Sequence, residues 1–99
     1  MRITWRHDKA RRNKLKHGLD FSLAAEVFRD PFAITSFDRN VDGRERWHMI
    51  GSIVSGRQFK LVVVVYSNPD PDVEDWVHII SLREATRHER EEHQIPHFR

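Results

Sequence analysis

Cysteine is absent from this 99-residue chain, and its absence excludes several kinds of site at once. Without a thiol the chain has no disulfide, no thiolate nucleophile and no cysteine ligand for zinc. Long apolar runs are missing too: the longest covers only residues 61–66, whereas a membrane-spanning helix needs about 20 apolar residues. The first residues contain no apolar segment typical of a secretory signal peptide. We therefore expect a cytoplasmic protein that does not enter a membrane.

Composition favours one small, strongly charged domain. Hydrophobic residues make up 38% of the chain, which is enough for one core, and we expect a single domain over residues 1–99. The net charge is only +2, but residues 1–17 contain seven Lys or Arg residues and one acid. This asymmetry indicates an anionic partner, unless the basic residues form a solvated helix face.

Two N-terminal helices are predicted from helix-forming residues and from the signals that end helices. Residues 8–17 are rich in helix formers, and Gly18 is a typical helix stop. Asp20 can cap a second helix, in which apolar residues between 21 and 28 recur at helical spacing. Pro31 ends that helix, because the residue before a proline is pushed out of helical geometry.

The middle of the chain predicts an antiparallel sheet. Residues 59–66 are nearly all apolar or β-branched, which is typical of a central strand buried on both faces. Short turn segments connect the strands as hairpins. The fold class is therefore α+β, with two N-terminal helices, a four-stranded antiparallel sheet and a C-terminal helix. The four strands are expected at residues 32–37, 44–54, 59–66 and 76–80.

The C-terminal helix is expected to begin at residues 81–84, whose Ser-x-x-Glu spacing is that of a capping box. Residues 86–93 are almost wholly polar, so this helix has no apolar stripe to bury. Arg83, Arg87 and Arg90 would fall on one helix face. We interpret this stripe as a binding surface, with a solvated face as the alternative.

Three segments carry further motifs that occur in order along the chain. They contain Trp5, Lys9, Asn13, Lys16-His17-Gly18, Phe21 and Phe28-Arg29-Asp30-Pro31; then Arg44-Glu45-Arg46 and Gly51; then Ile79-Ile80-Ser81-Leu82-Arg83-Glu84-Ala85-Thr86-Arg87-His88-Glu89-Arg90. In this order and at this spacing they resemble the BrnT family of toxins, over nearly the whole chain.

The resemblance implies a fold similar to that of the RelE-like ribonucleases. It implies a toxin of a type II toxin–antitoxin pair, acting as a metal-independent endoribonuclease that inhibits translation, with RNA as substrate and no cofactor. The partner would be a BrnA-like ribbon-helix-helix antitoxin that neutralises the toxin. The two would form a hetero-oligomer that represses its own operon and contacts DNA only through the antitoxin.

Metal-independent RNA cleavage needs groups that move protons and groups that neutralise the phosphorane charge. Arg83 is the first candidate phosphate clamp, because guanidinium matches phosphate oxygens and the expected helix start also favours an anion. An ion pair with Glu84 or Glu45 is the alternative for Arg83. Arg46 is predicted to be a second phosphate contact.

The proton-transfer candidates are two histidines and one carboxylate. His48 shares a strand face with Arg46, although an exposed strand histidine is its alternative interpretation. His78 is expected beside the buried central strand, where a neutral imidazole can exchange protons, or can be a core histidine bonded to a backbone carbonyl. Glu45 is a third candidate for proton transfer. The histidines and acids show no fixed ligand spacing, so we predict no metal.

Four further residues are predicted RNA contacts. Lys9 lies on a polar stripe of the first helix, whose alternative is a structural role that fixes Trp5 and the helix stop. Arg87 and Arg90 belong to the arginine stripe described above. Trp5 can stack on a base, a contact worth roughly 1–3 kcal/mol, or can belong to the core. A different class of function also fits these residues: a non-catalytic module that binds nucleic acid or a partner and acts in operon co-repression.

Overall fold

The structure, a computed structural model, describes residues 1–94, so the last five residues of the predicted domain lie outside the described part. No helix within this part is long and apolar enough to cross a membrane. Its elements in chain order are β1 (Arg2–Thr4), α1 (His7–His17), the short 3-10 helix η1 (Phe21–Leu23), α2 (Ala24–Arg29), β2 (Ile34–Val41), β3 (Arg44–Ser55), β4 (Gln58–Ser67), β5 (Trp76–Glu84) and α3 (Arg87–Gln94).

The strands form one mixed sheet in the order β1-β5-β4-β3-β2. Strands β2 to β5 pair antiparallel with their sequence neighbours, which confirms that part of the prediction. The predicted four-stranded sheet was incomplete, because β1 adds a fifth strand that runs parallel to β5. With three residues and Ile3 as its only large aliphatic side chain, β1 is too short for periodicity to reveal.

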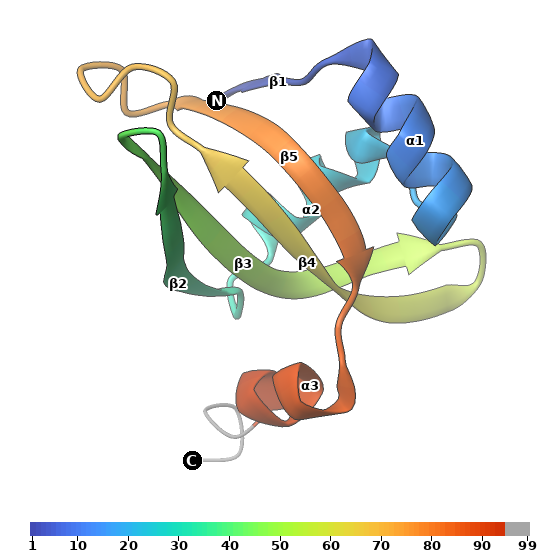
Figure 1. Ribbon diagram of the computed structural model, residues 1–99. Helices are drawn as coiled ribbons and strands as arrows, with labels where there is room; N and C mark the ends of the chain where they lie inside the picture. The colour runs from blue at the N-terminus through green and yellow to red at the C-terminus, as the bar shows by residue number, and fades with distance from the viewer. Residues whose placement is uncertain (95–99) are drawn as a thin grey trace.

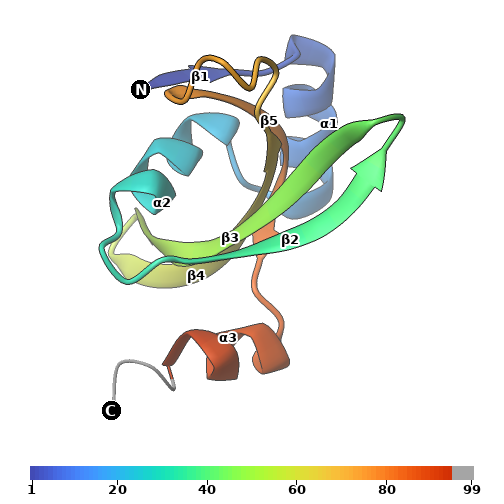
Figure 2. The same ribbon diagram turned by 90° about the vertical axis from the view of Figure 1, so that its left-hand side faces the viewer.

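The sheet curls around α2, so that α2 lies on its concave side and α3 on its convex side (Figures 1 and 2). The main core fills the concave side, where α2 and η1 pack on the central strands. A Cβ on Gly51 of β3 would lie 2.9 Å from Val27 Cγ1, so glycine allows α2 to approach the sheet closely. The fully buried core side chains include Phe21, Val27, Ile53, Val62, Val64, Ile79 and Leu82.

The two N-terminal helices begin and end close to where the sequence predicted. Gly18 ends α1 in the left-handed conformation, with φ of 71°, and its N–H donates to the Lys14 carbonyl. The Asp20 side chain accepts from the Ser22 N–H at the start of η1, and α2 follows. The β2–β3 hairpin turns at Asp42 and Gly43, where φ is positive at both residues.

The predicted start of the last helix was wrong. Residues 81–84 continue β5 as an extended strand, and α3 begins only at Arg87. A real capping box lies five residues further on: the Thr86 N–H donates to Glu89 Oε1, and the Glu89 N–H donates to Thr86 Oγ1. Leu82 belongs to the core on the concave side, and burying it requires β5 to continue past Ser81.

Asn13 of α1 pairs with the outer edge of β5 beyond the end of β1. Its Oδ1 accepts from the Leu82 N–H at 3.2 Å, and its Nδ2 donates to the Leu82 carbonyl at 2.8 Å. The same amide donates to the Leu19 carbonyl at 3.3 Å. One buried side chain thus satisfies a strand edge and the chain after the helix stop, and it fixes α1 along β5.

We expect Asn13→Ala to lower the free energy of unfolding by about 2–3 kcal/mol, because it leaves both buried backbone groups of Leu82 without their partner. Urea unfolding measures this loss. The matched control is Asn40→Ala, which removes an exposed amide from β2 and should change stability by about 0.5 kcal/mol or less. Equal losses in the two variants would contradict the edge-pairing role.

Candidate functional site

Strand register places four of the predicted site residues on the convex face of the sheet. Arg46 of β3 is opposite Ser67 of β4, which is opposite His78 of β5. Further along the same face, His48 is level with Val65, and Arg83 is level with Val63. Because directly opposed residues point to the same side of a sheet, one surface carries all four side chains.

A cavity of about 280 Å³ lies where this face meets the start of α1. Lys9 and Arg46 line it together with His78, and Arg6 and Arg44 complete its basic lining. Of the described residues that line this cavity, four are Lys or Arg and one, Asp42, is acidic. The local charge therefore favours an anion.

The basic lining continues along α1 in a second cavity of about 240 Å³, which shares Lys9 and Ile80 with the first. We call the two cavities together the cationic groove. Among residues 1–94, Lys9, Arg44 and Arg46 form no ion pair with a carboxylate. Their charges are thus available to phosphate oxygens. The second cavity adds Arg12, Lys16 and His17 to the groove.

His78 is the half-buried imidazole of the groove. Its Nδ1 lies 2.9 Å from Thr4 Oγ1, which also accepts from Trp76 Nε1 at 3.0 Å. Burial lowers the pKa of His78 below its usual 6.5, and the nearby charges of Lys9 and Arg44 lower the pKa further. The imidazole is therefore neutral at pH 7. When its Nδ1–H donates to the second lone pair of Thr4, Nε2 is left as a proton acceptor.

Asp38 is a residue of this face that the sequence analysis missed. It lies at an irregularity in the pairing of β2 and β3, between Phe37 and Arg39. Its Oδ1 is 3.4 Å from His48 Nε2, and its side chain is only 15% exposed. Bulges of this kind re-aim side chains and are common beside active sites. No periodic signal in the sequence could have revealed the irregularity.

Arg83 lies on the convex face in β5, so its predicted place in the first turn of a helix was wrong. Its guanidinium donates two hydrogen bonds to Glu89 of α3, at 2.7 and 3.0 Å. The ion-pair alternative is therefore realised, but with Glu89 and not with Glu84 or Glu45. These bonds, opposed by burial, hold the pKa of Glu89 at about 2. The pair holds α3 against the sheet, and the Arg83 guanidinium is engaged by Glu89.

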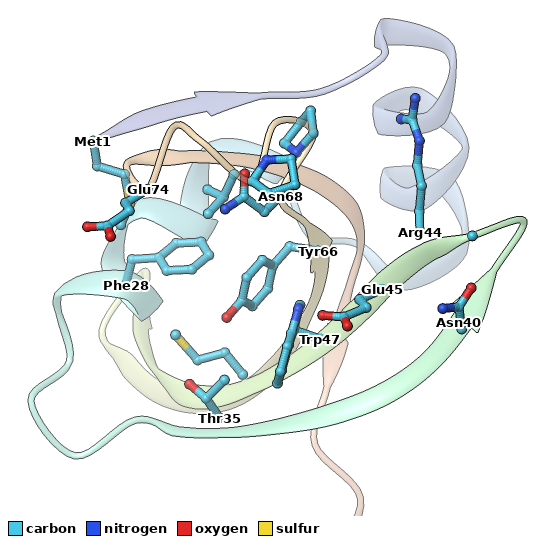
Figure 3. A pocket seen from close by; sticks show the side chains of 15 residues that line it. Met1, Phe28, Thr35, Asn40, Arg44, Glu45, Trp47, Tyr66, Asn68 and Glu74 are labelled. Carbon is cyan, nitrogen blue, oxygen red and sulfur yellow. The ribbon is translucent and has the colours of Figure 1, made fainter.

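The remaining predicted residues do not join the groove, apart from Lys9. Glu45 is exposed on the concave side, where Figure 3 shows it pointing toward Trp47 and Tyr66. Trp5 packs edge-to-face on Phe21, with ring centroids 6.2 Å apart, against the main core. Their proposed roles in catalysis and in base stacking stay predictions.

The predicted arginine stripe does not exist as one helix face, because Arg83 belongs to β5. Arg87 and Arg90 are exposed on α3, where Arg87 pairs with Glu91 at 3.3 Å and Arg90 donates to the Ala85 carbonyl at 3.0 Å. Both are already engaged within the helix segment. Within residues 1–94 no three His, Asp or Glu side chains are grouped closely enough to hold a metal ion.

Comparison with known protein families supports the resemblance found in the sequence. Residues 5–89 match the family described as "Ribonuclease toxin, BrnT, of type II toxin-antitoxin system". The chain belongs to the BrnT toxin family. A comparison with curated proteins finds no match. The matched span begins at Trp5, directly after β1. It includes strands β2 to β5 and both residues of the Arg83–Glu89 pair.

Membership of the BrnT family makes this chain a ribonuclease toxin of a type II toxin–antitoxin system. Such a toxin has an RNA target and an antitoxin partner. The cationic groove contains a neutral imidazole and, in Lys9, Arg44 and Arg46, cations that form no ion pair within residues 1–94, and these are the charge and the proton acceptor that an RNA-cutting site requires.

We expect nuclear magnetic resonance titration to give His78 a pKa below 6.5. In Lys9→Met the pKa should rise, because one neighbouring positive charge is removed, but it should stay below 6.5, because burial is the larger cause. Arg57→Met, in the exposed turn between β3 and β4, is the control and should leave the pKa unchanged. A His78 pKa that is equal in all three proteins would contradict the groove geometry.

We expect the Arg83–Glu89 pair to make stability depend on acid pH. The lowered pKa of Glu89 means that the contribution is fully present above about pH 4.5 and is lost as the pH falls toward 2. Urea unfolding from pH 6 to pH 2 should show a loss of stability, of which a part on the order of 2 kcal/mol is due to Glu89 and is removed in Glu89→Gln. Glu91→Gln, an exposed acid of the same helix, should keep the wild-type dependence. Parallel curves for all three proteins would count against the pair.

Proposed function

We propose that this toxin is a metal-independent endoribonuclease whose cationic groove binds and cuts single-stranded RNA and thereby inhibits translation. One observation supports the proposal above the others: strand register and the start of α1 gather Lys9, Arg46 and the neutral His78 around one cavity. Arg44 adds a fourth group from the same β3 segment. Within residues 1–94 no carboxylate forms an ion pair with these cations, and Asp42 is the one acid that lines the cavity.

The chemistry follows from these groups. His78 takes the proton of the 2′-hydroxyl, and the 2′-oxygen attacks phosphorus. The bond from phosphorus to the 5′-oxygen breaks, and that oxygen takes a proton from the Lys9 ammonium. Arg46 and Arg44 neutralise the charge that develops on the phosphorane oxygens. The products are a 2′,3′-cyclic phosphate and a free 5′-hydroxyl.

Arg83 belongs to the same face but to a more distant part of it, whereas His48 is two residues along β3 from Arg46 and does not line the groove. Strands lie about 4.8 Å apart and residues about 3.3 Å apart along a strand. The Cα atoms of Arg46 and His78 are then about 10 Å apart, and those of Arg46 and Arg83 about 16 Å apart. We therefore propose that Arg46 binds the reacting phosphate. Arg83, once it is released from Glu89, would bind a flanking phosphate of the RNA. Asp38 orients His48 between them.

The partner proposals rest on the family. We propose that the antitoxin is BrnA-like, with a ribbon-helix-helix part that contacts DNA, and that toxin and antitoxin form a hetero-oligomer that represses its own operon. The toxin would touch DNA only through this antitoxin. Because the RNA that it cuts is cytoplasmic, we propose that the toxin acts in the cytoplasm.

Purified toxin in EDTA should cut a single-stranded RNA, and His78→Ala and Arg46→Ala should each slow cleavage by about 10²-fold or more. The cleavage products, resolved on a denaturing gel, should carry a 2′,3′-cyclic phosphate. Arg57→Ala, an exposed arginine on the β3–β4 turn, is the matched control and should cut at the wild-type rate. Circular dichroism checks that each variant is folded.

Two outcomes would overturn this proposal. Intact RNA in every lane, with the toxin folded and binding RNA, would favour the non-catalytic binding module. Cleavage by the wild type that persists in His78→Ala and Arg46→Ala would place the active site elsewhere on the molecule.

A further inference from the structure

A further cavity lies on the concave side of the sheet and is not part of the cationic groove. Its volume is about 790 Å³, within the range of sites that accept a ligand or an inserted side chain, roughly 300–1,000 Å³. Phe28 of α2, Trp47 of β3 and Tyr66 of β4 line it, and Figure 3 shows all three rings directed into it. We call it the aromatic cleft.

The aromatic rings form a preorganised wall with exposed apolar surface beside it. Phe28 and Tyr66 meet edge-to-face with centroids 5.1 Å apart. Trp47 meets Phe37 in the same way at 5.5 Å, and the Phe37 side chain remains 54% exposed. An exposed aromatic patch that continues into a cavity is typical of a surface that receives an apolar anchor from another protein.

The rim of the cleft has the opposite charge to the groove. Glu45 and Glu74 both line it, and Glu74 belongs to the acidic β4–β5 loop, in which Asp70, Asp72 and Asp75 also lie. Arg44 and Met1, which carries the N-terminal ammonium, line the cleft as well, and Figure 3 shows the Arg44 side chain pointing away from the rings. With the three aspartates of the loop, the acids around the cleft outnumber these two cations, which favours a positively charged segment.

We propose that the aromatic cleft is the docking site of a partner segment in which a large apolar side chain is flanked by Lys or Arg, and that this segment belongs to the antitoxin. The apolar side chain would fill the space between Phe28, Trp47 and Tyr66, and the flanking cations would pair with Glu45 and Glu74. This inference rests on the toxin–antitoxin role given under Proposed function.

The proposal places the antitoxin and the RNA on different sides of the sheet. The two sites meet at the end of the β2–β3 hairpin, where Arg44 lines both the cleft and the groove. A segment docked beside Glu45 therefore contacts the same hairpin that presents Arg44 and Arg46 to RNA. Through this hairpin the antitoxin can neutralise the toxin without contacting the cations of the groove directly.

The test uses the ¹⁵N-labelled full chain and two synthetic peptides, both acetylated and amidated: Arg-Lys-Phe-Leu-Lys-Arg and its acidic counterpart Glu-Asp-Phe-Leu-Asp-Glu. The basic peptide should shift the indole N–H resonance of Trp47 and the amide resonances of Trp47 and Glu45, and the acidic peptide should not. Glu74→Lys should weaken the basic peptide at least fivefold, and Glu45→Gln should also weaken it. Glu91→Lys, an exposed acid of α3, is the matched control and should bind as the wild type does.

Several results would overturn the proposal. They are equal binding of the basic peptide to wild type and Glu74→Lys, absence of any shift at Trp47, or shifts confined to the groove around Lys9 and His78. A DNA hexamer, which lacks the 2′-hydroxyl and is not cut, provides a further arm: it should shift His78, and a shift at Trp47 instead would make the cleft a nucleic-acid site.

RNA cleavage by the same proteins separates this inference from the proposed function. Glu74→Lys should cut RNA at the wild-type rate, because Glu74 lies outside the groove. If the wild type binds the basic peptide at Trp47 but cuts no RNA, the docking proposal is supported and the nuclease proposal is contradicted. If the wild type cuts RNA but binds neither peptide, the nuclease proposal is supported and the docking proposal is contradicted.

Discussion

The pairing of β3, β4 and β5 is the constraint on which the rest of this molecule depends. Val62 and Val64 of β4 are buried in the concave core, and Val63 is buried on the convex face beside Ile50 and Ala85. A strand that is apolar on both sides can only be central, and its register then decides which polar residues of its neighbours share a face. A slip by one residue would exchange the groove residues with the core.

The same register separates two opposite charges on a small protein. Basic residues from α1 and β3 gather around His78 on one side of the sheet, and Glu45 with the acidic loop lies around the aromatic rings on the other. Because alternate residues of a strand point to opposite faces, Glu45 and Arg46 can serve different surfaces while adjacent in sequence. The nearly neutral total charge hides this separation.

The last helix shows how a polar segment is held without an apolar stripe. Its polar contacts include the Arg83–Glu89 pair with β5 and the approach of His93 Nε2 to Asp30 Oδ2, at the end of α2, at 3.8 Å. Asp30 in turn accepts from the Ser52 N–H of β3. The carboxylate of Asp30 therefore links the end of α2 to β3. Sequence patterning placed Arg83 in this helix, because Ser81 and Glu84 imitate a capping box.

The sequence by itself determined the two N-terminal helices, the presence of a C-terminal helix, the four antiparallel strands, the family and the identities of Lys9, Arg46 and His78 as candidates, because these follow from local periodicity, turn residues and motif order. Tertiary structure alone decided that β1 joins the sheet, that Arg83 is held by Glu89, that Asp38 faces His48 and that Glu45 lies away from the groove. These outcomes depend on pairing between residues distant in sequence and on one irregularity in a strand, and neither leaves a local pattern for the sequence to reveal.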